Sequence, residues 1–319
     1  MPGRVVSKAL LLLAALPLLG LLGCAPAVKK TERLSPEQVL PLRSASLEEL
    51  LEQLRQQEAA ITSINAVAEL IPSTGSAYSG VIEQYHDVRV FVLAERRSGN
   101  AAGNPTSGDA DGRWVRLLGQ APIVRKNIFD MVANEESFRI FLPSKNKFIL
   151  GPTRLSRRSD KPIENLRPQH LFDALFFEAP LPAALHLLEE NEFGGLRYYV
   201  VSEIIPAPPP AERAGSGGME MHRKWWFERS RLELVRVQHF EAGGKLVADI
   251  HYADWRRDGP APFPTRIELV RPGEDYRLKL NLKELTLNQP LPADAFHLEK
   301  PEGVEVVELT DEPPPEEWQ

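Results

Sequence analysis

This sequence has almost no cysteine and no excess of basic residues. Its 319 residues include one cysteine, Cys24, so no internal disulfide can form and the fold must hold by packing and hydrogen bonding. Lysines and arginines number 38 against 44 aspartates and glutamates, which gives a net charge of −6. Nucleic-acid-binding domains carry a broadly basic surface, so this composition argues against a nucleic-acid partner.

Long apolar runs are also missing, except for one close to the start. The run Ala9–Leu22 follows Arg4 and Lys8 and is nearly unbroken over about 14 residues. That length lies near the ~7–15 residues of a secretory core and below the ~20 residues that span a bilayer. The run ends in Leu21-Leu22-Gly23-Cys24, which resembles a bacterial lipobox.

The lipobox resemblance implies that Cys24 is a lipid attachment site. The leader, residues 1–23, would be removed, and the new N-terminal cysteine would carry acyl chains such as palmitate that insert among membrane lipids. Removal of the leader takes away two cations and no acids, so the net charge goes from −6 to −8. An ordinary signal peptide with an incidental cysteine and an uncleaved anchor are the two alternatives.

Composition divides the rest of the chain into three parts. Residues 24–45 are mostly polar and include three prolines, which is typical of a tether that holds a domain away from a membrane. Residues 306–319 form an acidic, proline-rich tail. Between them, residues 46–305 are enough for one large domain.

A helix is predicted over residues 47–60. Ser46 precedes it and Glu49 follows three residues later, which is the spacing of a capping box. Apolar residues then recur at helical intervals, at Leu47, Leu50, Leu51, Leu54 and Ile61. Two further short helices are predicted over 166–175 and 181–189, because a proline stands within the first turn of each.

Runs of β-branched and aromatic residues, separated by turn residues, occupy most of the domain. The spaces between them are too short for crossover helices, so neighbouring strands should pair antiparallel. The predicted strands cover residues 63–71, 79–85, 87–96, 113–120, 127–133, 137–143, 147–151, 195–205, 219–229, 231–240, 245–255, 265–271 and 276–287.

Several of these strands alternate between apolar and polar residues, as in YRLKLNLK at 276–283. A period of two predicts an antiparallel sheet with one apolar face. A sheet of about a dozen strands must curl, and few helices are available to cover it. We therefore expect a mostly β (α+β) fold, in which a large curled antiparallel sheet with sparse helical cover leaves an apolar concavity.

The order of these elements resembles the LolA/LolB lipoprotein-carrier superfamily. The middle segment RWVRLLGQAPIVRKNIFDMVANEESFRIFLPSKNKFILGP and the closing segment FPTRIELVRPGEDYRLKLNLKELTLNQPLPADAFHLEKPEGV are similar to the corresponding parts of LolA-like lipoproteins. The resemblance covers residues 46–303 and implies that the large curled antiparallel sheet forms an unclosed β-barrel with a few short helices as its lid. It also implies that this barrel binds lipoproteins or lipids in an apolar concavity. The insert from Arg97 to Arg113 contains no leucine, unlike the protruding loop of the family's outer-membrane receptor.

Two groups of residues are candidates for ligand contact. Apolar residues on the alternating strands would form the wall of the concavity: Phe138, Ile140, Leu142, Leu246, Ile250, Tyr276, Leu278, Leu280 and Leu282. Cations before the middle helices would contact anionic lipid headgroups, unless they only form a solvated loop: Lys145, Lys147, Arg157 and Arg158.

No catalytic residue, metal site or cofactor is expected. His251 and a nearby aspartate could form an acid–base pair, but the polar outer face of a strand is the simpler interpretation. His186 is expected on the surface of the helix predicted over 181–189. Adjacent Trp225 and Trp226 should point to opposite faces of a strand, so one of them would be exposed or covered by an arginine.

Two functions follow from these expectations. The first is a membrane-anchored module that binds an acyl chain, lipid or lipoprotein and takes part in envelope lipoprotein or lipid trafficking. The second is a non-enzymatic structural or assembly lipoprotein that uses the same fold to dock another envelope protein. Ala25, rather than an aspartate, follows Cys24, so by family analogy we expect a periplasm-facing position at the outer membrane.

The lipobox interpretation predicts the outcome of the substitution Cys24→Ser. Without the thiol no acyl chain can attach, so the protein should leave the membrane fraction or accumulate as an unprocessed precursor. Cell fractionation and the mass of the N-terminal peptide check this. A processed, membrane-bound Cys24→Ser protein would contradict the anchor.

Overall fold

The computed structural model of the protein describes residues 41–76, 81–84, 87–97, 112–153, 168–207 and 218–310. The expected leader, Cys24 and most of the expected tether lie outside these residues, as do Arg157, Arg158 and most of the expected tail. None of the helices in the described ranges is long and apolar enough to cross a bilayer.

The helix α2, Leu47–Ala60, has the bounds predicted from the sequence. The backbone N–H of Ser46 donates to the Glu49 carboxylate at 2.7 Å, and the backbone N–H of Glu49 donates to the Ser46 hydroxyl at 3.3 Å. These reciprocal bonds satisfy amides that a helix start leaves without partners. Leu50, Leu51 and Leu54 are buried on one side of α2, so the capping box and the apolar face agree.

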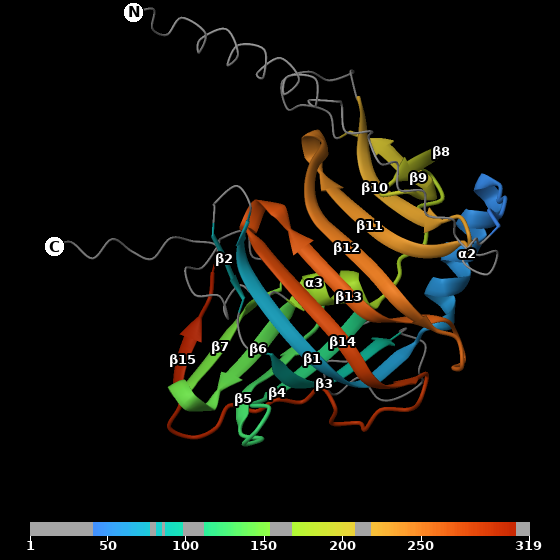
Figure 1. Cartoon of the computed structure of the whole chain (residues 1–319). Helices are drawn as coiled ribbons and strands as arrows, with labels where there is room; N and C mark the ends of the chain where they lie inside the picture. The colour runs from blue at the N-terminus through green and yellow to red at the C-terminus, as the bar shows by residue number, and fades with distance from the viewer. Residues whose placement is uncertain are drawn as a thin grey trace, which may run out of the picture. The chain divides into compact units, whose positions relative to one another are not determined.

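One 15-stranded sheet makes up most of the described chain (Figure 1). Its strands lie in the order β15-β7-β6-β5-β4-β3-β1-β14-β13-β12-β11-β10-β9-β8, and β2 pairs with β1 beside this path. All neighbours are antiparallel except β15 and β7, which are parallel. The sheet does not close into a barrel, which agrees with the unclosed barrel that the resemblance implied.

The strand bounds follow the sequence pattern closely. They are β1 Ser63–Ser76, β2 Val81–Gln84, β3 Val88–Arg97, β4 Gly112–Gln120, β5 Asn127–Ala133, β6 Ser137–Leu142, β7 Lys147–Pro152, β8 Leu185–Phe193, β9 Leu196–Pro206, β10 Met219–Glu228, β11 Glu233–Glu241, β12 Lys245–Arg256, β13 Phe263–Arg271, β14 Tyr276–Leu287 and β15 Glu305–Glu308. Three short 3-10 turns, η2 Pro143–Lys145, η4 Ala242–Gly244 and η5 Pro272–Glu274, join strands.

The helix predicted over 181–189 is wrong, because most of that segment belongs to strand β8. Leu185 to Phe193 pair with β9 without a register shift, from Leu185 opposite Ile204 to Phe193 opposite Leu196. A helix of this length is marginal in water without strong packing. Nine ladder positions on β9 outweigh the helix propensity of the alanines and leucines, which is tertiary context overriding a local preference.

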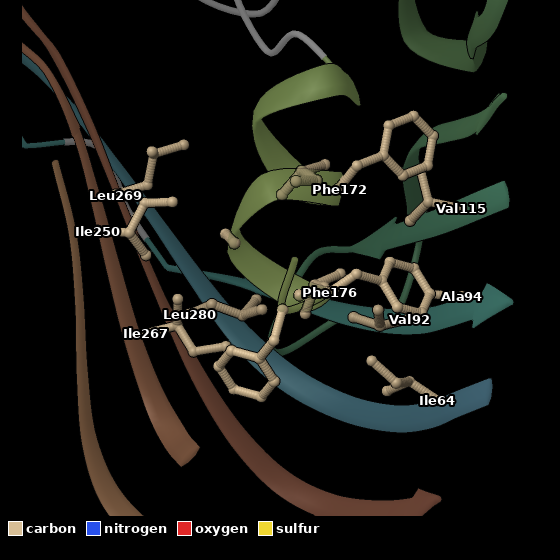
Figure 2. Close-up of a cluster of buried hydrophobic side chains, with 14 of the residues drawn as sticks. Ile64, Val92, Ala94, Val115, Phe172, Phe176, Ile250, Ile267, Leu269 and Leu280 are labelled. Carbon is tan, nitrogen blue, oxygen red and sulfur yellow. The ribbon is translucent and has the colours of Figure 1, made fainter. Parts of the chain in front are cut away.

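The other middle helix is present as α3, Pro168–Leu175, and lies on the concave, inner face of the sheet. In Figure 2, α3 lies between strands of the two sides of the sheet, with Phe172 directed toward Val115 and Phe176 toward Ala94. The buried residues of this inner face form one large apolar cluster that also contains Leu50, Leu51 and Leu54 of α2. The inner face is therefore the core of the protein.

A second, smaller apolar cluster lies on the outer face. Val132 and Phe148 of β5 and β7 pack there against Ala295, Phe296 and Leu298 of the segment after β14. Strand β15 then extends the sheet beside β7, where Glu305 lies opposite Lys147. The closing segment thus covers the outside of the sheet before it joins the edge.

Gly119 on β4 faces Phe129 on β5, and this pair generates a stability prediction. A Cβ atom on Gly119 would lie 2.3 Å from the Phe129 ring, and that ring is buried. We expect Gly119→Ala to lower the free energy of unfolding by about 1–3 kcal/mol through overpacking. Urea denaturation measures it, with Gly259→Ala as the control because its nearest atom would be 3.8 Å away. Equal stability of the two variants would contradict the packing argument.

Candidate functional site

The structure brings most of the predicted wall residues together on the inner face. Eight of the nine are buried in its apolar cluster: Phe138, Ile140, Leu142, Ile250, Tyr276, Leu278, Leu280 and Leu282. Leu246, near the start of β12, is only partly buried and lies outside that cluster. The set comes from β6, β12 and β14, so strands from both sides of the sheet contribute to one apolar surface.

The protein's own side chains fill much of this surface. α3 and the three residues after it, up to Glu178, form a segment that we call the plug. Its buried apolar side chains are Leu171, Phe172, Ala174, Leu175, Phe176 and Phe177. Phe177 lies within 5.9 Å, between ring centres, of Tyr252, Trp255 and Phe263. The wall residues alone did not indicate that these aromatic rings would occupy the concavity.

Glu178 ties the plug to both sides of the sheet. Its carboxylate accepts from Arg113 of β4 at 2.7 Å and from Arg223 of β10, which makes an even shorter contact. Six strands separate β4 from β10 in the sheet order, so this one side chain bridges the concavity. Asp173 of α3 lies 3.7 Å from the same Arg113 guanidinium. We call Arg113, Arg223, Asp173 and Glu178 the inner latch.

Backbone groups of the plug are also held by the sheet. Arg96 of β3 donates to the carbonyl oxygen of Phe177 at 2.9 Å and forms an ion pair with Glu58 of α2 at the same distance. The Tyr252 hydroxyl donates to the carbonyl oxygen of Asp173 at 3.4 Å. The plug is thus fixed at both its helical part and its end.

Burial gives the two latch carboxylates different pKa values. Burial, together with the nearby charge of Glu178, raises the pKa of Asp173 to about 6 despite Arg113. Burial alone would raise the pKa of Glu178 too, but the positive charges of Arg223 and Arg113 outweigh it and lower that pKa. The arginines therefore compensate Glu178 for the loss of hydration of its negative charge. For Asp173 the same loss is only partly compensated.

His239 of β11 lies beside the latch and stays neutral. Burial and the charge of Arg223 lower its pKa to about 3. Its Nε2 atom is buried without a hydrogen-bond partner, and it lines a cavity of about 10 Å³ together with Asp173, Glu178 and Tyr252. That volume is about the space of one water molecule.

His186 is on β8, and its ring faces the inner side instead of a helix surface. Its Nε2 lies 3.1 Å from the carboxylate of Glu203 on β9, which is fully buried. The same carboxylate accepts from the backbone N–H of Leu181 at 2.6 Å, while His222 lies 3.9 Å away. Sequence reasoning missed this buried pair because it placed His186 on the wrong type of element.

Asp249 and His251 on β12 belong to an ion cluster rather than to an acid–base site. Arg236 donates two hydrogen bonds to Asp249, at 2.7 and 2.6 Å, and His251 lies 3.2 Å from it. Burial would raise the pKa of Asp249, but these hydrogen bonds outweigh it and lower the pKa to about 2. Arg236 also covers Trp226 at 5.2 Å, while Trp225 is buried inside, as the alternation predicted.

The predicted headgroup residues are only partly described. Lys145 in the turn η2 is exposed, whereas Lys147 forms an ion pair with Glu305 at 3.0 Å. Arg157 and Arg158 lie outside the described residues. Within the described ranges, no group of three or more His, Cys, Asp or Glu side chains is arranged to hold a metal ion.

Comparison with known proteins supports the fold and no finer assignment. No family model and no curated protein matches the chain. A DUF1329 family protein from Desulfovibrio piger ATCC 29098 has a similar structure, with a TM-score of 0.51 and 11% identity over 77% of this chain and 94% of that one. This likeness shows a shared fold alone.

Two further structures match at lower scores, which carry no argument of their own. A domain named for outer membrane lipoprotein sorting, from Vibrio parahaemolyticus, has a TM-score of 0.48 and 13% identity over 79% of this chain and 97% of that one. A LolA superfamily protein from Nitrosomonas europaea has a TM-score of 0.45 and 13% identity over 79% and 98%. The architecture expected from the sequence, a large unclosed and mostly antiparallel sheet with a helix on its inner face, is confirmed.

The raised pKa of Asp173 predicts how pH changes stability. An acid whose folded-state pKa is raised from 3.8 to about 6 stabilises the fold below pH 4, and this contribution is lost as pH rises through 6. Asp173→Asn should remove that loss, so at pH 8 the variant should be more stable than the natural protein by about 1–2 kcal/mol.

The natural protein alone does not isolate this effect, because the lowered pKa values of Glu178 and His239 make the fold more stable as pH rises. The comparison must therefore be made between variants. Urea denaturation of both proteins from pH 4 to pH 8 isolates the Asp173 contribution, and Asp87→Asn at an exposed position is the control. A stability difference between Asp173→Asn and the natural protein that does not change with pH would refute the assignment.

Proposed function

We propose that this protein is a lipid-anchored, non-enzymatic envelope protein whose inner face binds an acyl chain of a lipid or lipoprotein. The observation that carries the proposal is the apolar inner face, which a short, separately anchored segment fills. Its position would be at the outer membrane, facing the periplasm, with the acylated Cys24 as the anchor. No catalytic step, metal or cofactor is assigned to it.

The plug is the part that an acyl chain would displace. Phe172, Phe176 and Phe177 cover strands of both sides of the sheet, and a hydrocarbon chain offers the same kind of contact. Each methylene group of a buried chain contributes about 0.8 kcal/mol, so a chain of ordinary length can compete with three aromatic side chains. The plug's few polar contacts, chiefly Glu178 with its arginines, would have to open for the exchange.

The basic turn is proposed to orient the protein on the membrane. Lys145 is exposed and makes no ion pair with any described residue, so it is available to an anionic headgroup. Lys147 is partly neutralised by Glu305, and its contribution would be smaller. Arg157 and Arg158 follow in the sequence and would add to the same attraction.

A second candidate is a docking platform for another envelope protein. The filled inner face favours it, because a core that is complete without a ligand leaves the outer surface as the part that contacts a partner. The two candidates differ in one measurable property: the first requires an apolar probe to enter the inner face, and the second does not.

Removal of one plug aromatic tests the acyl-binding proposal. We expect the natural protein to bind a fluorescent fatty acid and Phe176→Ala to bind it several-fold more tightly, since the ligand no longer has to displace a buried ring. The control is Phe193→Ala, which removes an exposed ring from β8. Phe176→Ala should also lose about 3–5 kcal/mol of stability, so circular dichroism must accompany the titration.

Crowding the wall should act in the opposite direction. Leu280→Phe enlarges a buried wall residue without changing polarity and should weaken binding of the same probe. If neither the natural protein nor a folded Phe176→Ala variant binds the probe, acyl binding is refuted and the docking platform takes its place.

A further inference from the structure

The two ends of the sheet are built differently. Strand β15 ends one side with four residues and a glutamate at each end, whereas β8 ends the other side with nine residues and, among the described strands, pairs only with β9 (Figure 1). Edge strands expose unpaired backbone groups, and proteins usually protect them by short length, lysine, proline or bulges. β8 has no lysine or proline and pairs with β9 without a register shift, so its glutamates and its contacts with α2 are the only such features among the described residues.

Apolar side chains gather at this unprotected edge. Among the described residues, eleven large hydrophobic side chains are exposed, and five of them lie between residues 181 and 196. Leu185, Leu187 and Phe193 are 50%, 46% and 71% exposed and share one face of β8, because strand side chains alternate. Leu196 stands opposite Phe193 and extends the same face. Such a concentration exceeds the scattered exposed leucines of an ordinary surface.

The middle of β8 is acidic. After Leu187 and Leu188 the strand has three glutamates, Glu189, Glu190 and Glu192. No lysine or arginine lies on the strand. Glu190 and Glu192 form ion pairs with Arg229 and Arg197, although both carboxylates stay about two-thirds exposed. Glu189 makes no ion pair with any described residue and lies on the same face as Leu187. The edge therefore offers a negative centre with apolar residues on either side.

We propose that β8 is a docking edge for an extended, basic segment of a partner protein, which adds to the sheet as a further strand. Main-chain hydrogen bonds to the open edge would supply affinity, and alternate side chains would supply specificity. The pattern on β8 selects a segment with lysine or arginine at its centre and apolar residues at both ends. The proposal is independent of acyl binding, because this face of β8 points away from the inner cluster.

A second copy of the chain fits this edge poorly. Glu189 is the central residue of β8. If β8 paired along its full length with β8 of another molecule, the two Glu189 side chains would therefore lie opposite each other, whether the strands ran parallel or antiparallel. Like charges directly opposite each other in a sheet are destabilising. A basic segment of a partner protein meets no such repulsion. Charge complementarity therefore favours this segment over a second copy of the chain.

A synthetic nine-residue peptide with lysines at its centre and leucines at both ends, labelled with a dye, tests the proposal on the full chain. Fluorescence anisotropy should show binding that weakens with salt, and hydrogen exchange should show slower exchange of the amides of residues 185–193. The matched probe, with glutamate in place of lysine, should bind about tenfold more weakly or not at all, because it meets the acidic centre with like charge.

Two lysine substitutions on opposite edges give the decisive comparison. Leu187→Lys protects β8 and repels a basic strand, so it should weaken binding about tenfold or more. Val306→Lys makes the same change on β15, where the side chain is also about half exposed, and should leave binding unchanged. Unchanged hydrogen exchange of β9 and β10 shows that the variants are folded.

Three results would overturn the proposal. The first is a loss of selectivity, seen in either of two comparisons. The basic and acidic peptides would bind equally well, or Leu187→Lys and Val306→Lys would bind the basic peptide equally well. The second is a dimer in sedimentation velocity that Leu187→Lys dissolves, which would make a second copy the occupant. The third is protection that appears on inner-face strands instead of β8. Fatty-acid binding is not expected to change in Leu187→Lys, so failure here leaves acyl binding untouched.

Discussion

A single carboxylate, that of Glu178, connects the two sides of a sheet that never closes. Its arginine partners stand on β4 and β10, which are far apart in the sheet order but face each other across the inner side. A curled sheet of this size leaves an apolar hollow, and apolar surface exposed to water is costly. The plug fills the hollow with aromatic rings, and the ion pairs of Glu178 keep it there.

Because the latch is partly buried, its charges are favourable chiefly as a set. Two arginines meet two carboxylates, and Glu178 takes most of the favourable interaction, while the pKa of Asp173 rises. A buried ion pair contributes less to stability than its geometry implies, since each ion must lose its water. The latch thus specifies where the plug lies more than it stabilises the fold.

Apolar side chains are also covered on the outer side of the sheet. The segment after β14 packs Phe296 and Leu298 against β5 and β7, so the outer side of these strands is dry as well. Arg97 lies over both Trp114 and Phe296, 5.3 and 5.2 Å from their ring centres. At the other end of the sheet, Leu187 and Phe193 of β8 are exposed in the part of the chain that the structure describes. Val306 of β15 is exposed too, so the apolar layer covers β5 and β7 and not the two edge strands.

Much of the fold could be predicted from local signals. The capping box at Ser46 and Glu49 defined α2, and the alternation of Leu278 and Leu280 with lysines identified both the strand and its inner face. These signals succeed because they depend on backbone geometry that repeats within a few residues. The prediction for residues 181–189 was wrong, since the leucines and alanines of that segment favour a helix and only the pairing of Leu185–Phe193 with β9 makes a strand.

The sequence by itself determined the class of fold, the single apolar face and the residues that line it. Only the tertiary structure decided that the protein's own aromatic rings fill that face, and that Arg113 and Arg223 meet at Glu178. These partners are 65 and 45 residues from Glu178 along the chain. No local period encodes such a meeting, because it depends on how far the sheet curls, and curl is the sum of small twists over every strand between them.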